Sequence, residues 1–192
     1  MRNIVCIFLF LVFVVSSCEG RKTKNQALSE DIEEFKKTVT VEVPVYEPKS
    51  YLERQVDTLL HNGYRVKIKT HTDMDNAVLF TKIKDTINYQ TYYRNFKFSI
   101  LIERNGKRIF NNYFDKEHIN QLFKYNASNI PALKDFDKLS VLKSIELNEG
   151  VSNSESIEID VLYAIPNTDR VSLHTMIINE SGMMTIEQKL LN

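Results

Sequence analysis

The chain has 192 residues, and its 25 basic side chains balance 25 acidic ones, so its formal net charge is zero. A neutral chain lacks the overall basic charge that attracts nucleic acid, and we expect no nucleic-acid partner. With only five glycines it contains neither a G-x-G-x-x-G loop nor a P-loop, so phosphate-cradling nucleotide sites of those kinds are excluded.

Residues 1–17 have the pattern of an export signal. Arg2 precedes an apolar run from Ile4 to Val15, which is shorter than the roughly 20 residues that a membrane-spanning helix needs. The next residues, Val15-Ser16-Ser17-Cys18, resemble the lipobox of bacterial lipoproteins. That resemblance implies cleavage before Cys18 and lipidation of Cys18. Two alternatives stay open: a secreted protein with an incidental cysteine, and a short anchor that is not cleaved.

The expected lipid anchor has consequences for the location of the protein and for its two cysteine thiols. A single acyl chain binds a bilayer only marginally, whereas a cysteine with several chains stays attached, so the membrane is the first expected partner. Cys6 leaves with the signal, and no free thiol, disulfide or thiolate metal site remains. The resemblance implies the bacterial cell envelope. Since no acidic segment follows Cys18, we expect the outer membrane, with the protein facing the periplasm.

Residues 18–38 are highly charged and predict a lipidated tether with a helix around residues 29–37. A single domain is expected over residues 39–192. Its first strand, 39–45, carries Pro44 and is therefore predicted at a sheet edge. Ser50 and Glu53 form a capping box, which predicts a helix that ends before Asn62-Gly63. Two strands are then expected, at 64–70 and 78–83.

The centre of the chain predicts a β-hairpin around Asn105-Gly106, which is a strong signal for a two-residue turn. An unbroken register places Phe96, Phe98, Ile100 and Ile102 on one face with Ile109 and Tyr113. The same register places Leu101, Phe110 and Phe114 on the other face. The expected cross-strand pairs are Arg104 with Lys107, Ile102 with Ile109, and Phe98 with Tyr113.

The last third predicts two more helices and three strands. Asp115 is expected to cap a helix over 116–124, and Pro131 to open a longer one whose apolar face is Leu133, Phe136, Leu139, Leu142 and Ile145. Strands are expected at 156–165 and 170–178, joined by a turn, with a weak final strand. The predicted fold class is α+β, a mainly antiparallel sheet with three to four helices packed on it.

The segments "IPNTDR" and "INESG", with "NGKRIF" before them, are similar to parts of small uncharacterised envelope lipoproteins of the Bacteroidetes type. That resemblance spans roughly residues 90–187 and implies no catalytic residue. The only pattern that resembles a metal site is His71-Thr72-Asp73-Met74-Asp75. It has no second histidine, and a polar loop is the better interpretation. We expect no catalytic residue, no metal and no cofactor.

Aromatic and basic residues alternate in "INYQTYYRNFKFSI", from residue 87 to 100. On a regular strand Tyr89, Tyr93 and Lys97 share a face, and we interpret them as a candidate landing place for a sugar ring or an extended peptide. The alternative is that a helix covers both rings as part of the core. Asp85-Thr86-Ile87 also resembles a short O-glycosylation acceptor motif of Bacteroidetes-type envelopes.

These observations favour a membrane-anchored envelope lipoprotein that binds or assembles without catalysis, with a protein or a glycan as its partner. The alternative is a hydrolase of envelope polymers that works through carboxylates with no recognisable motif. Buried carboxylates in a cleft would favour the hydrolase.

Overall fold

A computed structural model of the chain describes residues 23–38, 41–84, 87–125, 131–153 and 155–189. The signal, Cys18 and Thr86 lie outside these ranges. Two compact units make up the chain: residues 1–42 with 83–88, and residues 43–82 with 89–192. Within the described ranges no helix is both long and apolar enough to cross a membrane.

The expected tether helix is confirmed as α2 (Lys24–Thr38), and it begins earlier than predicted. Thr23 and Gln26 form the capping pair: the Thr23 backbone N–H donates to Gln26 Oε1 at 3.0 Å, and the Gln26 N–H donates to Thr23 Oγ1 at 3.3 Å. This reciprocal pair satisfies two N–H groups at the helix start, so Ser29 lies inside the helix instead of capping it.

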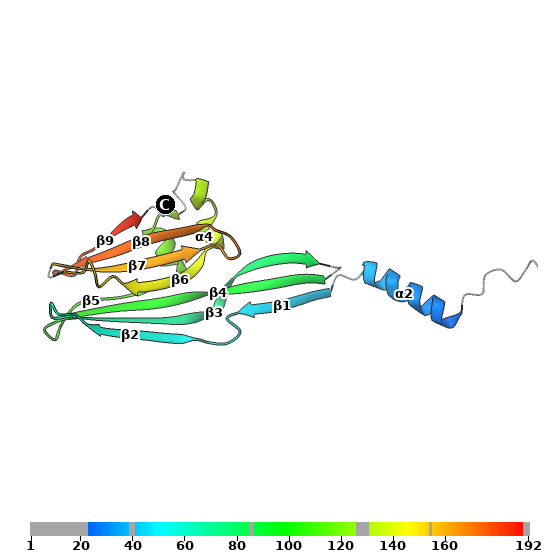
Figure 1. The fold of residues 1–192 in the computed structure, drawn as a ribbon, viewed down its shortest axis with the longest axis horizontal. Helices are drawn as coiled ribbons and strands as arrows, with labels where there is room; N and C mark the ends of the chain where they lie inside the picture. The colour runs from blue at the N-terminus through cyan, green and yellow to red at the C-terminus, as the bar shows by residue number, and fades with distance from the viewer. Residues whose placement is uncertain (1–22, 39–40, 85–86, 126–130, 154, 190–192) are drawn as a thin grey trace, which may run out of the picture. The chain divides into compact units, whose positions relative to one another are not determined.

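Two sheets form the second unit, apart from the ends of three strands (Figure 1), and the pairs β2–β3, β4–β5, β6–β7, β7–β8 and β8–β9 are antiparallel. The first sheet has the order β1-β4-β3-β2, with β5 also paired to β4; the second has the order β6-β7-β8-β9. The strands of the first sheet are β1 (Val41–Glu47), β2 (Glu53–Leu59), β3 (Tyr64–Lys84), β4 (Ile87–Arg104) and β5 (Lys107–Phe114). The strands of the second sheet are β6 (Val141–Leu147), β7 (Ser156–Ala164), β8 (Val171–Asn179) and β9 (Met184–Lys189). Between β5 and β6 along the chain, three short helices lie in the described ranges: α3 (Lys116–Leu122), η3 (Pro131–Leu133) and α4 (Phe136–Leu139).

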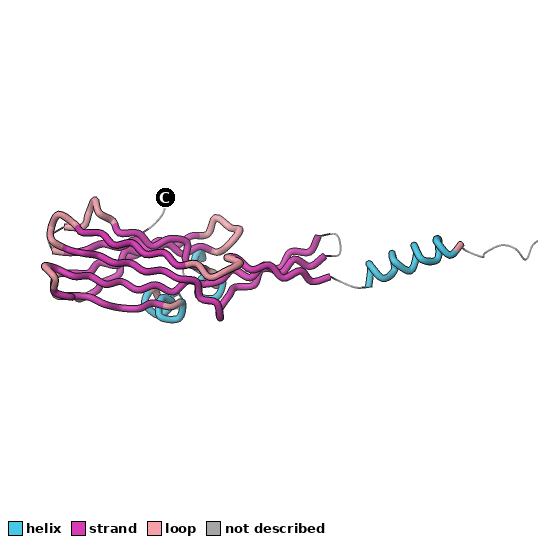
Figure 2. The backbone as a smooth tube through the Cα atoms, turned by 90° about the horizontal axis from the view of Figure 1, so that it is seen from below, coloured by secondary structure: helices cyan, strands magenta, loops and turns pink. Residues whose placement is uncertain are grey.

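The predicted α+β class is wrong, because the chain is rich in strands arranged in two sheets. Figure 2 shows these strands as two layers, with only short helices beside them. One core cluster takes residues from both sheets, among them Phe98 and Ile100 of the first and Ile159 and Met176 of the second. The hydrophobic face of each sheet is therefore covered mainly by the other sheet, as in a β-sandwich.

The helix expected between residues 50 and 60 is wrong, since that segment is β2. Its residues also alternate with a period of two: Val56 and Thr58 pair with Ile68 and Val66 of β3. Glu53 does not close a capping box, because its carboxylate accepts a hydrogen bond from the Tyr51 hydroxyl at 2.7 Å. Pairing with a long neighbouring strand outweighs the local helix signal.

The long helix predicted from Pro131 is also wrong. Only η3 and the four-residue α4 are helical, and Leu142 and Ile145 belong to β6. Likewise, the strands predicted at 64–70 and 78–83 are one continuous strand, β3, so the loop expected between them is wrong.

The Asn105-Gly106 turn is confirmed, and both residues have positive φ, 49° and 76°, as a type I′ turn requires. The predicted register holds for Arg104 with Lys107 and fails beyond Glu103, where a bulge shifts the pairing. Ile102 therefore pairs with Phe110, and Phe98 with Phe114. The bulge moves Phe110 and Phe114 to the core side, the reverse of the predicted face.

Several other predictions are confirmed. Asp115 caps α3, its Oδ1 accepting from the His118 backbone N–H at 2.8 Å. β1 is an edge strand, as Pro44 indicates. β7 and β8 match the strands expected at 156–165 and 170–178 to within one residue at either end, and β9 is the expected final strand, for which no bounds were predicted.

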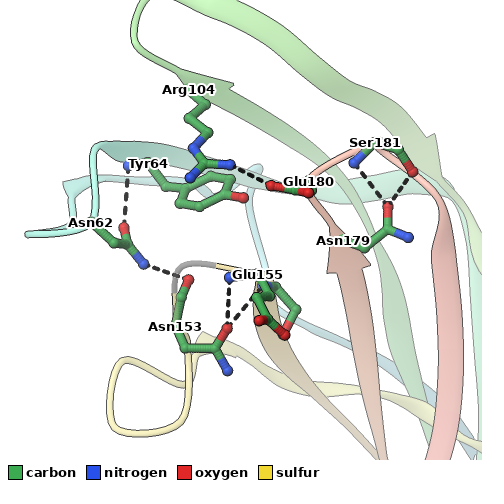
Figure 3. Close-up of polar contacts among 9 residues, drawn as sticks. Asn62, Tyr64, Arg104, Asn153, Glu155, Asn179, Glu180 and Ser181 are labelled. Carbon is green, nitrogen blue, oxygen red and sulfur yellow. Dashed lines mark hydrogen bonds and ion pairs between the residues drawn. The ribbon is translucent and has the colours of Figure 1, made fainter.

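Polar contacts between turns tie the two sheets together at one end of the second unit (Figure 3). The Asn62 amide donates to the Asn153 carbonyl at 2.6 Å, and Arg104 pairs with Glu180 at 2.8 Å. Gly182 also belongs to this end: with φ at +80°, a Cβ atom there would lie 2.1 Å from the Ile109 carbonyl oxygen. Only glycine lets the β8–β9 turn approach β5 so closely.

Candidate functional site

A polar pocket of about 310 Å³ opens where β5 ends beside β4. The β4–β5 pairing stops at Phe98 and Phe114, so Asn95 and Lys97 lie just beyond the last paired residues. The chain then enters α3, whose first residues complete the wall. The lining residues are all polar: Asp73, Asn76, Asn95, Lys97, Asp115, Lys116, Glu117 and Asn120.

Asp73 and Lys97 form the charged centre of this pocket. Lys97 Nζ lies 3.2 Å from Asp73 Oδ2, and only 4% of Asp73 is exposed. Burial alone would raise the pKa of Asp73. Hydrogen bonds from the Asn76 amide and the Asp75 N–H, together with Lys97, outweigh burial and lower that pKa below its ordinary value. The hydrogen bond to Asp73 raises the pKa of Lys97. Both groups are therefore charged at neutral pH.

Two asparagine amide oxygens on the pocket wall are buried and have no partner within the described protein. Asn95 is 7% exposed, and its Oδ1 accepts no hydrogen bond. Asn120 donates through Nδ2 to the Asp137 carbonyl at 2.9 Å, while its Oδ1 is also unpaired. A buried acceptor without a donor costs about 1–3 kcal/mol, so such groups call for an explanation.

Lys116 closes the inner end of the pocket and is structural. Its Nζ donates to the carbonyl oxygens of Phe136 and Ser140 at 3.1 and 2.8 Å, and it lies 4.8 Å from the centre of the Tyr163 ring. Burial lowers the pKa of Lys116 to about 7, and the Asp137 carboxylate opposes that shift. The ammonium holds α4 against α3, so the pocket wall is fixed by the helices.

A buried histidine lies deeper in the sandwich. The His174 ring stacks on Phe123 with centroids 3.9 Å apart, and its Nδ1 lies 3.3 Å from the Ser172 hydroxyl. Burial lowers the pKa of His174 to about 4, so the imidazole is neutral at physiological pH. A neutral ring fits its position between aromatic side chains.

The side chains of the metal-like pattern at residues 71–75 do not point to one common site. His71 stacks between Tyr51 and Tyr113, with centroids 6.2 and 6.1 Å away, while Asp73 pairs with Lys97. These residues lie in a continuous strand, so the predicted polar loop is wrong as well. No set of three or more His, Cys, Asp or Glu side chains in the described ranges is arranged to hold a metal ion.

The three predicted ligand-binding residues do not meet in one place. Lys97 lines the pocket, but neither tyrosine does. The Tyr93 ring packs edge-on against Phe80 at 5.6 Å, and its hydroxyl accepts from the Asn167 amide at 2.9 Å. Tyr89 is 38% exposed. Tyr93 therefore has its own packing and hydrogen-bond partners.

Sequence reasoning missed the pocket asparagines and the part that Asp73 plays. Asn95 interrupts an aromatic strand with an amide at a position that strand propensity disfavours, and this was the available signal. Asp73 meets Lys97 because β3 continues through residues 71–75, where the sequence predicted a loop. A scan of protein-family models and a search of curated proteins found no match to this chain.

Proposed function

We propose that the chain is a lipid-anchored protein of the bacterial cell envelope, facing the periplasm from the outer membrane, and that it binds a carbohydrate in the polar pocket without converting it. The anchor rests on the sequence: a short apolar run followed by Val15-Ser16-Ser17-Cys18. The ligand class rests on the chemistry of the pocket wall.

The observation that carries the ligand class is the lining of the pocket, in which every residue is polar and the Asp73 carboxylate and the Asn95 and Asn120 amides lie beside Lys97. A sugar hydroxyl donates one hydrogen bond and accepts others, so a ring with neighbouring hydroxyls can bind acceptors and donors together. A purely apolar ligand would find no matching surface in such a pocket.

The charge and the volume of the pocket limit the class of ligand further. Three carboxylates and two lysines line the pocket, and Lys97 is already paired with Asp73. This balance disfavours phosphate and other anions, whose approach the carboxylates would oppose. The volume of about 310 Å³ is at the small end of the range for small-molecule pockets. A neutral monosaccharide unit, alone or at the end of a glycan, fits both limits.

The ligand class is tested by titrating the full chain with glucose, galactose, mannose and N-acetylglucosamine, observed by saturation-transfer NMR and calorimetry. At least one sugar is expected to bind, and Asn95→Ala should weaken that binding by about tenfold because a polar group is lost from the pocket lining. Asn111→Ala is the matched control, since Asn111 is exposed on β5 and outside the pocket. Equal affinity of the two variants, or no sugar binding at all, would contradict the proposal.

The anchor is tested by metabolic labelling with a fatty-acid analogue. Cys18→Ala is expected to carry no label and to leave the membrane fraction or stay uncleaved, because the acylated sulfur is gone. Ser17→Ala keeps a small residue before the cysteine and should keep the label. Label retained on Cys18→Ala would refute the anchor.

The hydrolase alternative draws on the same carboxylates, since Asp73, Asp115 and Glu117 share one pocket. A general acid needs a raised pKa, and the pKa of Asp73 is lowered. Asp115 already uses one oxygen to cap α3. These two observations favour binding over hydrolysis. Release of sugar from an envelope polymer, abolished in Asp73→Asn, would favour the enzyme instead.

A further inference from the structure

An apolar groove of about 370 Å³ lies between β2 and β6, the strands at one edge of each sheet. Its floor contains Ile68 of β3 and Phe96 of β4, and none of the pocket residues lines it. The other apolar lining residues are Leu52, Val56, Leu142 and Ile145. Two sheets that meet along this edge without a strand between them leave the apolar side chains accessible.

β6, one of the two edge strands beside the groove, is poorly suited to accept an added strand. β6 has a bulge between Leu142 and Ser144, where its pairing with β7 shifts by one residue. The extra residue is Lys143, and it is exposed. A bulge and a lysine on an edge strand are the features that prevent strand addition in natural sheets. The occupant is therefore recognised through side chains rather than through backbone pairing.

The rim of the groove has an excess of positive charge. Arg54, Lys143 and Glu53 are the charged lining residues. Glu53 is already engaged, because its carboxylate lies 3.0 Å from Lys69 Nζ and accepts from the Tyr51 hydroxyl. Arg54 lies on the opposite face of β2 from Glu53, the face that carries Val56 toward the groove. Two cations thus border an apolar channel.

We infer that this groove binds a long-chain fatty acid, with the acyl chain along the apolar floor and the carboxylate beside Arg54 and Lys143. The apolar side chains favour any alkyl chain, since burial of apolar surface drives association without regard to the head group. The two cations select a carboxylate head, because charge-assisted hydrogen bonds to arginine and lysine are stronger than those between neutral groups. The inference is independent of the sugar pocket.

The test uses the full chain in phosphatidylcholine vesicles with a diazirine-labelled fatty acid. After photolysis, adducts are expected on peptides that contain residues 52–56 or 142–145, and laurate should displace the probe about tenfold better than dodecanol. In Arg54→Gln/Lys143→Gln that preference should disappear. Lys82→Gln, which removes an exposed lysine of β3 outside the groove, should keep it.

Three results would overturn the inference. The first is adducts that map to other parts of the chain, and the second is equal displacement by laurate and dodecanol in the unaltered protein. The third is binding of an acidic extended peptide at the groove with no displacement by laurate, which would assign the site to a peptide. A Ser144→Phe variant, which fills the groove, should lose the adducts whatever the head group.

Discussion

The polar pocket and the apolar groove take side chains from the same two strands. Phe96 and Lys97 are neighbours on β4, yet Phe96 lines the groove and Lys97 lines the pocket. On β3, Ile68 lines the groove and Asp73 the pocket. One stretch of sequence can therefore contribute to two sites of opposite polarity. The remaining lining makes the difference: residues of β2 and β6 complete the groove, whereas Asp115 and the first residues of α3 complete the pocket.

The largest effect on stability is expected at Gly182, in the β8–β9 turn that lies against β5. In Gly182→Ala the new Cβ would meet the Ile109 carbonyl oxygen at 2.1 Å, at a φ that alanine disfavours. We expect a loss of about 3 kcal/mol or more in unfolding free energy, from strain and overpacking combined. Gly106→Ala is the control: its φ is +76° with no atom within 4 Å, so about 1–2 kcal/mol is expected. Similar losses in urea unfolding would contradict the close approach.

The next largest loss of stability is expected at Tyr93, and a smaller one at Tyr89. Neither tyrosine lines the pocket. Tyr93→Ala should cost about 2 kcal/mol, because the ring packs on Phe80 and its hydroxyl accepts from Asn167. Tyr89→Ala should cost less, about 0.5 kcal/mol, since Tyr89 is 38% exposed. Neither variant should change sugar affinity. A fall in sugar affinity with an unchanged melting temperature would return both tyrosines to the binding site.

A smaller loss of stability is expected when charged residues of the pocket or of the groove are replaced. Lys97→Met leaves the buried Asp73 carboxylate without its cation, and we expect a loss of about 1–2 kcal/mol in thermal unfolding. The groove cations are exposed, so Arg54→Gln/Lys143→Gln should cost less than about 0.5 kcal/mol. If both variants lose the same stability, the pocket ion pair contributes no more than surface charges do.

The last effect concerns the pH dependence of stability and comes from the buried His174, which lines neither the pocket nor the groove. The pKa of His174 is about 4 in the folded protein and about 6.5 in an unfolded chain, so between these values only the unfolded state takes up the proton. Stability should therefore fall as the pH drops from 6.5 to 4, with a slope of at most about 1.4 kcal/mol per pH unit. His174→Phe should flatten that slope between pH 5 and 6.5. An unchanged slope would show that other groups produce it.

Sequence reasoning found the elements whose signals are local. The Asn105-Gly106 turn, the Asp115 cap and the last three strands were predicted from turn chemistry, capping and alternation. It failed where partners distant in sequence decide. β2 carries both a capping box and a period of two, and only its pairing with β3 selects the strand. β6 is likewise fixed by its pairing with β7.

The candidate site was predictable only in part. Lys97 was selected for its place on the aromatic strand, and it does line the pocket. Asp73 could not be placed because the sequence predicted a loop at residues 71–75, whereas β3 continues through them and brings Asp73 to Lys97.

The contacts between turns that tie the two sheets together have a consequence for the folding rate. Asn62 bonds to a carbonyl 91 residues away, and Arg104 pairs with a carboxylate 76 residues away, so neither contact forms until most of the chain is present. Structures dominated by such distant contacts fold on the millisecond-to-second scale, because long loops must close first. A chain that emerges residue by residue therefore stays incompletely folded until the turn at residues 179–182 has emerged.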